Sequence, residues 1–332
     1  MRNALILNMI LLIGTLNLMG LSSSTAEPET NLVILSSSAV GGLYYPTAGS
    51  IANAVNQKRN EYGFRITVKS RRSSVSTLNR IMSGEIYFGE AQQSRIYQAH
   101  KGLAEWKGSP QTDLCSVFNT HAESITLIAS VESGIRTILD LRDKRIGIGS
   151  PGSDLHHNVI NILTAVGIDY KTDLTVVDDR MEAVPDLLQD REIDAFFYPV
   201  GTLSRPFMDL ISGTKKVRLV PIAAPGIDVL LAANPFYEKA MVPMTLYPGL
   251  DDHGGVEALG VKMSLITSCG IPDKTVYIVT KETFENFEPF EKRHPKASMM
   301  TGKGMIEGLP APVHPGAMKY YKESGMDALL RP

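Results

Sequence analysis

The chain has 332 residues, 43% of them hydrophobic and 20% charged, which is enough for about two globular domains with sizeable cores. Its formal net charge is −2, from 33 basic and 35 acidic residues, so it lacks the basic surplus of a nucleic-acid-binding protein. No segment after residue 30 offers the roughly 20 apolar residues of a membrane span.

The first 26 residues have the features of a secretory signal peptide. Arg2 is followed by an apolar run that reaches Leu21, and small residues up to Ala26 precede a polar stretch. We expect cleavage after Ala26 and a periplasmic location. The alternative is an uncleaved anchor, which the polar residues Asn8 and Asn17 inside the run disfavour.

Strand-like runs alternate with helical patterns from residue 32 onward, which is typical of α/β proteins with mainly parallel sheets. The first unit contains predicted strands at 32–35, 65–69 and 86–91, and predicted helices at 47–55 and 74–84. The second unit contains predicted strands at 124–130, 144–149, 175–177, 193–198 and 218–222, and predicted helices at 159–166 and 183–188.

After Pro235 the pattern is helical with Pro and Gly breaks and predicts no strands, so this stretch must pack on an earlier unit. We therefore expect a first lobe made of both ends of the chain, an inserted second lobe, and a hinge near 119–124 and 222–235. The predicted organisation is a signal peptide at 1–26, a first lobe at 27–120 and 234–332, and a second lobe at 121–233.

The chain has two cysteines, Cys115 and Cys269, without the spacing of a metal site. An oxidising compartment permits a disulfide, but the sequence does not place the two residues close together. Both a disulfide and two buried thiols stay open, and the thiols are favoured.

Each predicted lobe has a glycine-rich turn between a strand and a helix, at 41–46 and at 149–153. Glycine lets backbone N–H groups approach a ligand, and a helix N-terminus favours negative charge. Two such turns facing each other would hold a small anion from both sides. The alternative is that both are ordinary connections of an α/β protein.

Basic and aromatic residues near the same predicted sheet edge are further candidates for ligand contact. Arg71 and Arg72 precede the helix that begins at Ser74. Positive charge at a helix N-terminus is unfavourable unless an anion bound nearby neutralises it. Arg95 follows the strand at 86–91, and arginine binds carboxylates through two parallel hydrogen bonds. Tyr198 ends a predicted strand at the same edge.

A rival interpretation is a nicotinamide-dependent oxidoreductase, because residues 147–152 match G-x-G-x-x-G and Asp178 and Asp179 follow the next strand. Pro151, the position of the motif in mid-chain and the predicted export argue against it. The adjacent His156 and His157 would point about 100° apart on a helix and make a poor metal pair. We expect no enzyme activity, no catalytic residues, no cofactor and no metal. A third possibility is a surface antigen that binds no metabolite.

Several motifs in the same order resemble the TAXI family of TRAP transporter solute receptors. The resemblance covers about residues 32–325 and rests on Gly42-Leu43-Tyr44-Tyr45-Pro46, Ser74-Val75, Ser83-Gly84-Glu85, Gln93-Ser94, Pro151-Gly152-Ser153, Ile193-Asp194-Ala195-Phe196-Phe197, His314-Pro315-Gly316-Ala317 and Tyr320-Tyr321-Lys322-Glu323.

The resemblance implies a two-lobed periplasmic-binding-protein-like fold, in which mainly parallel sheets flanked by helices close at a hinge. It also implies a receptor that passes a small organic anion, glutamate-like or a dicarboxylate, to the fused membrane subunit of an ion-driven transporter. We expect the receptor to be a monomer. The ligand-binding residues carried over by position are Gly42, Leu43, Tyr44, Ser74, Gln93, Ser150, Gly152, Ser153 and Tyr198.

The chain departs from the family pattern at three positions near these motifs. Arg72-Ser73 replaces Asn-Gly, Arg95 replaces an acid, and Asp154-Leu155 replaces Gly-Thr. We add Arg72, Arg95 and Asp154 to the expected ligand-binding set. These residues favour a highly charged anion, or one that also carries an amine for Asp154.

Overall fold

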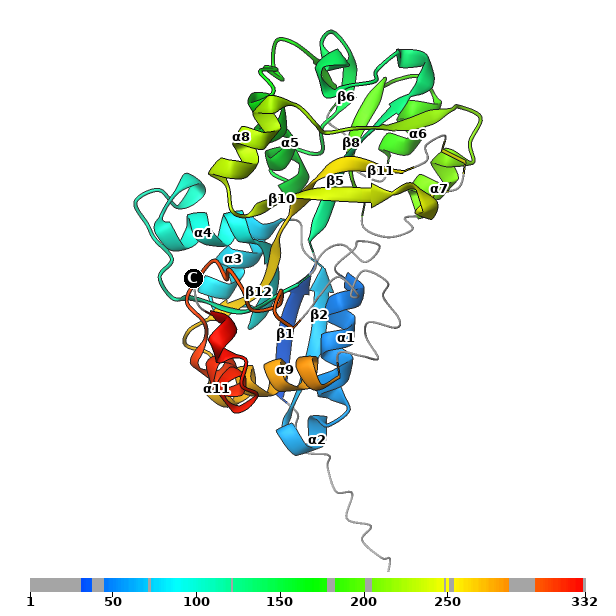
Figure 1. Ribbon diagram of the computed structural model, residues 1–332. Helices are drawn as coiled ribbons and strands as arrows, with labels where there is room; N and C mark the ends of the chain where they lie inside the picture. Colours follow the sequence, from blue (N-terminus) through cyan, green and yellow to red (C-terminus); the bar gives the residue numbers. More distant parts are fainter. Residues whose placement is uncertain are drawn as a thin grey trace, which may run out of the picture.

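The computed structural model describes residues 31–37, 45–70, 73–120, 122–177, 183–200, 205–247, 249–250, 254–286 and 302–330. Within these residues the chain forms two lobes, each built on one β-sheet (Figure 1). The first lobe contains both the blue N-terminal and the red C-terminal parts of the chain, and the second lobe is green and yellow. The expected two-lobed α/β fold is confirmed.

Five strands form the sheet of the first lobe in the order β2-β1-β3-β12-β4, as far as the structure describes it. They are β1 (Asn31–Ser37), β2 (Phe64–Ser70), β3 (Phe88–Gln92), β4 (Leu114–Asn119) and β12 (Met263–Ser268). β1 is parallel to β2 and β3, whereas β12 is antiparallel to β3 and β4. The returning strand β12 therefore lies inside the first sheet.

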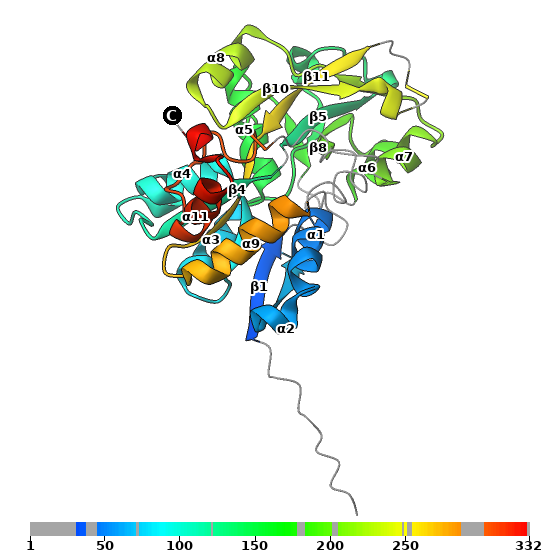
Figure 2. The same cartoon turned by 60° about the horizontal axis from the view of Figure 1, so that its bottom comes forward.

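Helices cover both faces of this sheet. They are α1 (Tyr45–Asn56), α2 (Arg59–Tyr62), α3 (Ser74–Met82), α4 (Gln93–Lys101), α9 (Asp273–Glu285) and α11 (Pro315–Glu323), with the short helices η1 (Ala104–Trp106) and η6 (Asp327–Leu330). α1, α9 and α11 bury one apolar cluster around Leu35, Phe118 and Tyr321. α3 and α4 bury a second cluster around Leu78 and Ile96. Figure 2 shows α9 beside α1, so the two ends of the chain share one core.

The described strands of the second lobe form a seven-stranded sheet. They are β5 (Glu123–Ser130), β6 (Arg145–Gly147), β7 (Thr175–Val177), β8 (Ala195–Val200), β9 (Val217–Val220), β10 (Tyr237–Pro243) and β11 (Gly255–Val261). β6 is parallel to β7 and β8, but β5 is antiparallel to β8, β9 and β11. This sheet is therefore mixed rather than mainly parallel.

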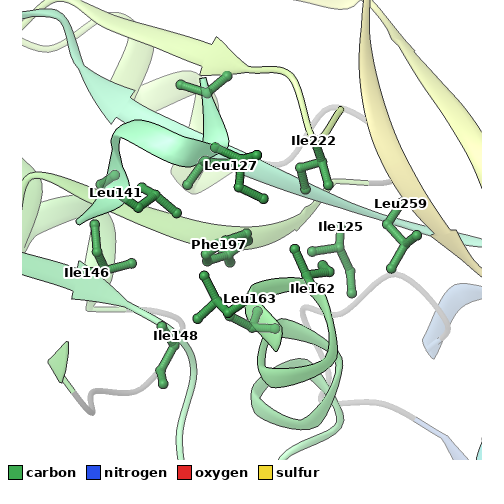
Figure 3. Close-up of a cluster of buried hydrophobic side chains, with 14 of the residues drawn as sticks. Ile125, Leu127, Leu141, Ile146, Ile148, Ile162, Leu163, Phe197, Ile222 and Leu259 are labelled. Atoms are coloured by element: carbon green, nitrogen blue, oxygen red, sulfur yellow. The ribbon is translucent and has the colours of Figure 1, made fainter. Parts of the chain in front are cut away.

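The helices of the second lobe also lie on two faces. They are α5 (Asp154–Ala165), α6 (Val184–Gln189), α7 (Arg205–Ile211) and α8 (Pro225–Ala233), with the short helices η2 (Val131–Ser133), η3 (Ile138–Leu141) and η4 (Met244–Leu246). Figure 3 shows the core beneath α5, where Ile162 and Leu163 pack among Ile125, Leu127 and Phe197 of the sheet. Periodic apolar residues thus fix α5 on the lobe and leave its polar face outside this core.

The chain crosses between the lobes twice within the described residues. The first crossing lies between β4 and β5, where the sequence predicts a hinge. The second lies at Lys262, between β11 and β12, and not at 222–235. The prediction of no strands after Pro235 is wrong, because β10, β11 and β12 all lie there. Since β10 and β11 pair within the second sheet, we propose residue 261 as the end of the second lobe in place of 233.

Cys115 and Cys269 form a disulfide with their Cα atoms 5.1 Å apart. Cys115 lies in β4, and Cys269 follows the neighbouring strand β12. The preference for two thiols is therefore wrong, because antiparallel pairing of two strands distant in sequence brings the cysteines together.

The tail motif from His314 onward has a structural role. His314 caps α11: its Nδ1 accepts from the Gly316 N–H at 3.0 Å, and its Nε2 lies 3.0 Å from the Ile271 carbonyl oxygen. A Cβ on Gly316 would lie 2.3 Å from the backbone oxygen of Asp273, so only glycine allows α11 to approach α9 this closely. The motif therefore packs α11 against α9 in the first lobe.

Candidate functional site

Three helices begin where the two lobes meet. α3 and α4 follow β2 and β3 of the first lobe, and α5 follows β6 of the second. Because β1, β2 and β3 run parallel, their carboxyl ends and the helix N-termini after them gather at one edge of the sheet. Hydrogen bonds between α5 and this edge, described below, identify it as the edge that faces the second lobe.

Ser74 and Asp154 join the two lobes directly. The Asp154 carboxylate accepts from the Ser74 backbone N–H at 2.9 and 3.1 Å and from the Ser74 hydroxyl at 2.8 Å. The same hydroxyl accepts from the Gln92 N–H at 3.0 Å, and Ser74 is fully buried. Two residues that the sequence predicts to bind a ligand thus bind each other.

A second polar contact lies one turn further along α5. The Asn158 amide donates to the Gln92 side chain at 3.1 Å and accepts from the Tyr237 hydroxyl at 2.8 Å. Asn161 donates to the same hydroxyl at 2.8 Å and lies 3.3 Å from Nε2 of His157. These residues are not among those predicted from the sequence to contact a ligand. Their signal is a polar stripe at i, i+4 and i+7 along α5, formed by Asp154, Asn158 and Asn161.

Gln93 is buried inside the first lobe. Its amide donates to Asn119 at 2.7 Å and to Ser264 at 3.1 Å, and Asn119 in turn donates to the Gly304 and Glu307 carbonyls. The Gln93 N–H donates to the Lys262 carbonyl at the second crossing. The side chain therefore fastens β4 and β12 beside the hinge.

Arg95 is also buried, at 5% exposure, and its hydrogen bonds are to residues of its own lobe. Its Nη1 donates to Gln98 at 3.0 Å and to Glu105 at 3.0 and 3.2 Å. Arg95 therefore has an ion-pair partner, Glu105, in its own lobe.

The glycine-rich turn before α5 folds onto its own helix. Gly149 and Gly152 have φ of +85° and +79°, a region that favours glycine. The Ser153 side chain caps α5 by accepting from the His156 N–H at 3.2 Å, and Nδ1 of His156 lies 2.9 Å from the Gly149 carbonyl oxygen. Ser150 accepts the Ser153 N–H through its carbonyl at 3.0 Å. The turn thus ends beside the lobe contact made by Asp154.

Tyr198 lies in an apolar cluster of the second lobe. The residue is 6% exposed, and its ring packs edge-on against Phe196, with the ring centroids 5.9 Å apart. Gly42, Leu43, Tyr44 and Arg72 lie outside the described residues, as do Asp178 and Asp179. The structure therefore brings together Ser74 and Asp154 from the expected set and places Tyr198 in the apolar core of the second lobe.

Burial lowers the pKa of His157 to about 4, and the nearby charge of Arg95 adds to the effect, whereas Glu105 and Asp154 oppose it. Burial also lowers the pKa of His314. Both histidines are therefore neutral in the folded protein near pH 7, in keeping with their roles as hydrogen-bond acceptors.

Protonation of these histidines is therefore expected to destabilise the protein at a higher pH than protonation of its carboxylates does. A depressed histidine pKa contributes stability above the unfolded value of about 6.5, and this stability is lost as the pH falls toward the folded value of about 4. The lowered carboxylate pKa values of Asp194 and Glu282 act mainly below about 4.5. Urea unfolding at pH 7.5, 6.5 and 5.5 should show a falling midpoint, and the fall should be smaller in His157→Gln. An equal fall in both proteins would contradict this assignment.

Among the residues that the structure describes, no helix is long and apolar enough to cross a membrane. No group of three or more His, Cys, Asp or Glu residues in the same part of the chain could hold a metal ion.

Comparison with known proteins identifies the fold and the family. The periplasmic binding protein BugD is 14% identical, with a TM-score of 0.52 over 90% of this chain and 95% of that chain. A second structure, a periplasmic transporter, is 15% identical, with a TM-score of 0.51 over 91% of this chain and 96% of that chain. These similarities concern the fold, which is that of periplasmic binding proteins. The model of the NMT1-like family matches residues 35–325, and the chain therefore belongs to the NMT1-like family.

Proposed function

We propose that the protein is an exported solute-binding receptor that closes two lobes around a small organic anion. The observation that carries this proposal is the pair of crossings between two α/β lobes, with α3, α4 and α5 beginning where the lobes meet. Two short connecting segments between separate cores can bend without disturbing either core, which is the mechanical requirement of a hinge. The similarity to a periplasmic binding protein and a periplasmic transporter supports the same proposal.

The anionic character of the solute rests on local chemistry rather than on net charge. Helix N-termini carry unpaired N–H donors and about half a positive charge, and three of them lie near the lobe contact. Arg71 and Arg72 precede α3 in the sequence. We propose a glutamate-like acid or a dicarboxylate as the ligand class, bound where the two lobes meet without a metal or cofactor.

The transporter type is proposed from the ordered motifs alone. The glycine-rich opening, the P-G-S turn at 151–153 and the tail from His314 resemble TAXI receptors of TRAP transporters. We infer that a closed, ligand-bound form is recognised by a fused membrane subunit of such a transporter, and that the receptor acts as a monomer in the periplasm after removal of residues 1–26. Ligand would favour closure by its extra contacts in the closed form.

A panel of organic acids tests the proposal by thermal unfolding. A ligand that binds the native state stabilises it, and at 100 times its Kd the gain is about 2.7 kcal/mol, so a true ligand should raise the Tm by several degrees. Mass spectrometry of the small molecule released on denaturation identifies what co-purifies. A panel of glutamate, dicarboxylates and related acids that leaves the Tm unchanged, with nothing released, contradicts the proposal. That result would instead favour the alternative that the chain is a surface protein that binds no metabolite.

Arg72→Ala should weaken binding of the identified acid by about tenfold or more, because a charge-assisted arginine contact contributes about 1.5–3 kcal/mol. Titration calorimetry measures the affinity, with the exposed Arg136→Ala as the matched control in the second lobe. Equal affinity in the two variants removes Arg72 from the site.

For Gln93→Ala the structure changes the expectation from weak binding with an intact fold to a loss of stability, since Asn119 and Ser264 would lose a buried partner.

A further inference from the structure

Asp154 occupies the place that an anion would take at the start of α3. Its two carboxylate oxygens receive the Ser74 N–H at 2.9 and 3.1 Å, and one of them also receives the Ser74 hydroxyl at 2.8 Å. A backbone N–H and a hydroxyl in the first turn of a nine-residue helix are the donors that such a helix offers to a bound carboxylate. Here the second lobe itself provides the carboxylate.

The contact is anchored on both sides. On the first lobe, the Ser74 hydroxyl is fixed by the Gln92 N–H and Ser73 caps the helix by accepting from the Ser76 N–H. On the second lobe, Asp154 and Asn158 lie four residues apart on the same face of α5, and Asn158 binds the Gln92 side chain at 3.1 Å. One face of α5 therefore makes two polar contacts with the same corner of the first lobe.

We propose that Asp154 is a built-in anion that latches the two lobes at the α3–α5 edge without bound solute. The latch makes Ser74 unavailable to the ligand's acidic group, so other donors must hold that group. Asp154 is then a positioning residue that sets how far the empty receptor opens. This inference deepens the proposed receptor function, but its test uses protein without ligand.

Distances between spin labels on the two lobes show whether the lobes are held together at the α3–α5 edge. Because the two native cysteines are paired with each other, exposed Lys101→Cys and Asp190→Cys supply separate labelling sites on the first and second lobes. Double electron–electron resonance on the ligand-free mature protein should give one short population. Asp154→Ala should add a longer one and shift the closed-to-open ratio by at least about tenfold, the loss expected for hydrogen bonds to a charged group. Asp186→Ala, an exposed aspartate in the first turn of α6, is the matched control and should leave the distances unchanged.

Added acetate distinguishes a carboxylate latch from a general effect of charge. At about 100 mM, acetate should restore the short population in Asp154→Ala by mass action, whereas sodium chloride at the same ionic strength should not. Restoration by both salts alike overturns the role of a carboxylate. Unchanged distances in Asp154→Ala overturn the latch itself.

Ser74→Ala provides the second route, should Asp154→Ala fail to melt cooperatively. It removes one of the three hydrogen bonds and leaves the N–H, so a smaller opening is expected, and no opening overturns the proposal. The outcomes that reject the latch differ from the outcomes that reject the receptor function. Unchanged distances with a Tm that rises on addition of an organic acid reject the latch alone. An open Asp154→Ala with no acid that raises the Tm rejects the receptor function alone.

Discussion

Removal of the Cys115–Cys269 disulfide is expected to lower the free energy of unfolding by about 3–5 kcal/mol. The bond joins residues 154 positions apart, and a cross-link that closes a long loop restricts the unfolded chain strongly. Urea unfolding of the Cys115→Ala/Cys269→Ala variant, compared with the unmodified protein, measures the loss.

Reductant provides the control for this measurement. Dithiothreitol should shift the unfolding midpoint of the unmodified protein toward that of the double variant and leave the double variant unchanged. An unmodified protein whose midpoint does not respond to reductant, and which contains two free thiols by mass spectrometry after alkylation, would contradict the paired state.

Gly316→Ala is expected to destabilise the first lobe by about 2–3 kcal/mol. The added Cβ would lie 2.3 Å from the Asp273 carbonyl oxygen and 2.9 Å from the Tyr277 nitrogen, and both are backbone atoms that cannot rotate away. α11 would have to move from α9 and give up part of the core around Tyr321. Thermal unfolding monitored by circular dichroism measures the change.

Gly49→Ala is the matched control, because Gly49 also lies in a helix but a Cβ added there would meet nothing within 4 Å. Alanine there should leave stability unchanged or raise it by up to about 1 kcal/mol, since glycine is a poor helix former. A Gly316→Ala protein as stable as Gly49→Ala would show that α11 can shift at no cost.

The alternation of strands and helices can be predicted from the sequence wherever the apolar residues repeat with a clear period. The helix predicted at 159–166 is of this kind and lies within α5, whereas the strand at 124–130 is recognised from a run of apolar and β-branched residues. β10 is missed because the adjacent residues Glu238 and Lys239 in its first half are both exposed and leave no such period. The misplaced second crossing follows from that omission, since a strand that is not recognised cannot be assigned to a sheet.

The site is harder to predict than the fold, because a motif identifies a helix start but not what fills it. Ser74 and Asp154 each have the sequence context of a ligand contact, and only the arrangement of the lobes shows that they face each other. Arg95 is balanced by Glu105, which lies ten residues away on η1. Tyr198 ends a predicted strand, but the neighbouring strands and helices of the second lobe cover its ring.

The disulfide brackets the entire second lobe. Cys115 lies just before the chain leaves the first lobe, and Cys269 just after it returns, so every residue of the second lobe belongs to one covalently closed loop. A single proteolytic cut anywhere in that loop leaves both fragments of the chain in one molecule. The disulfide also ties together the two strands of the first sheet that lie next to the crossings, β4 and β12.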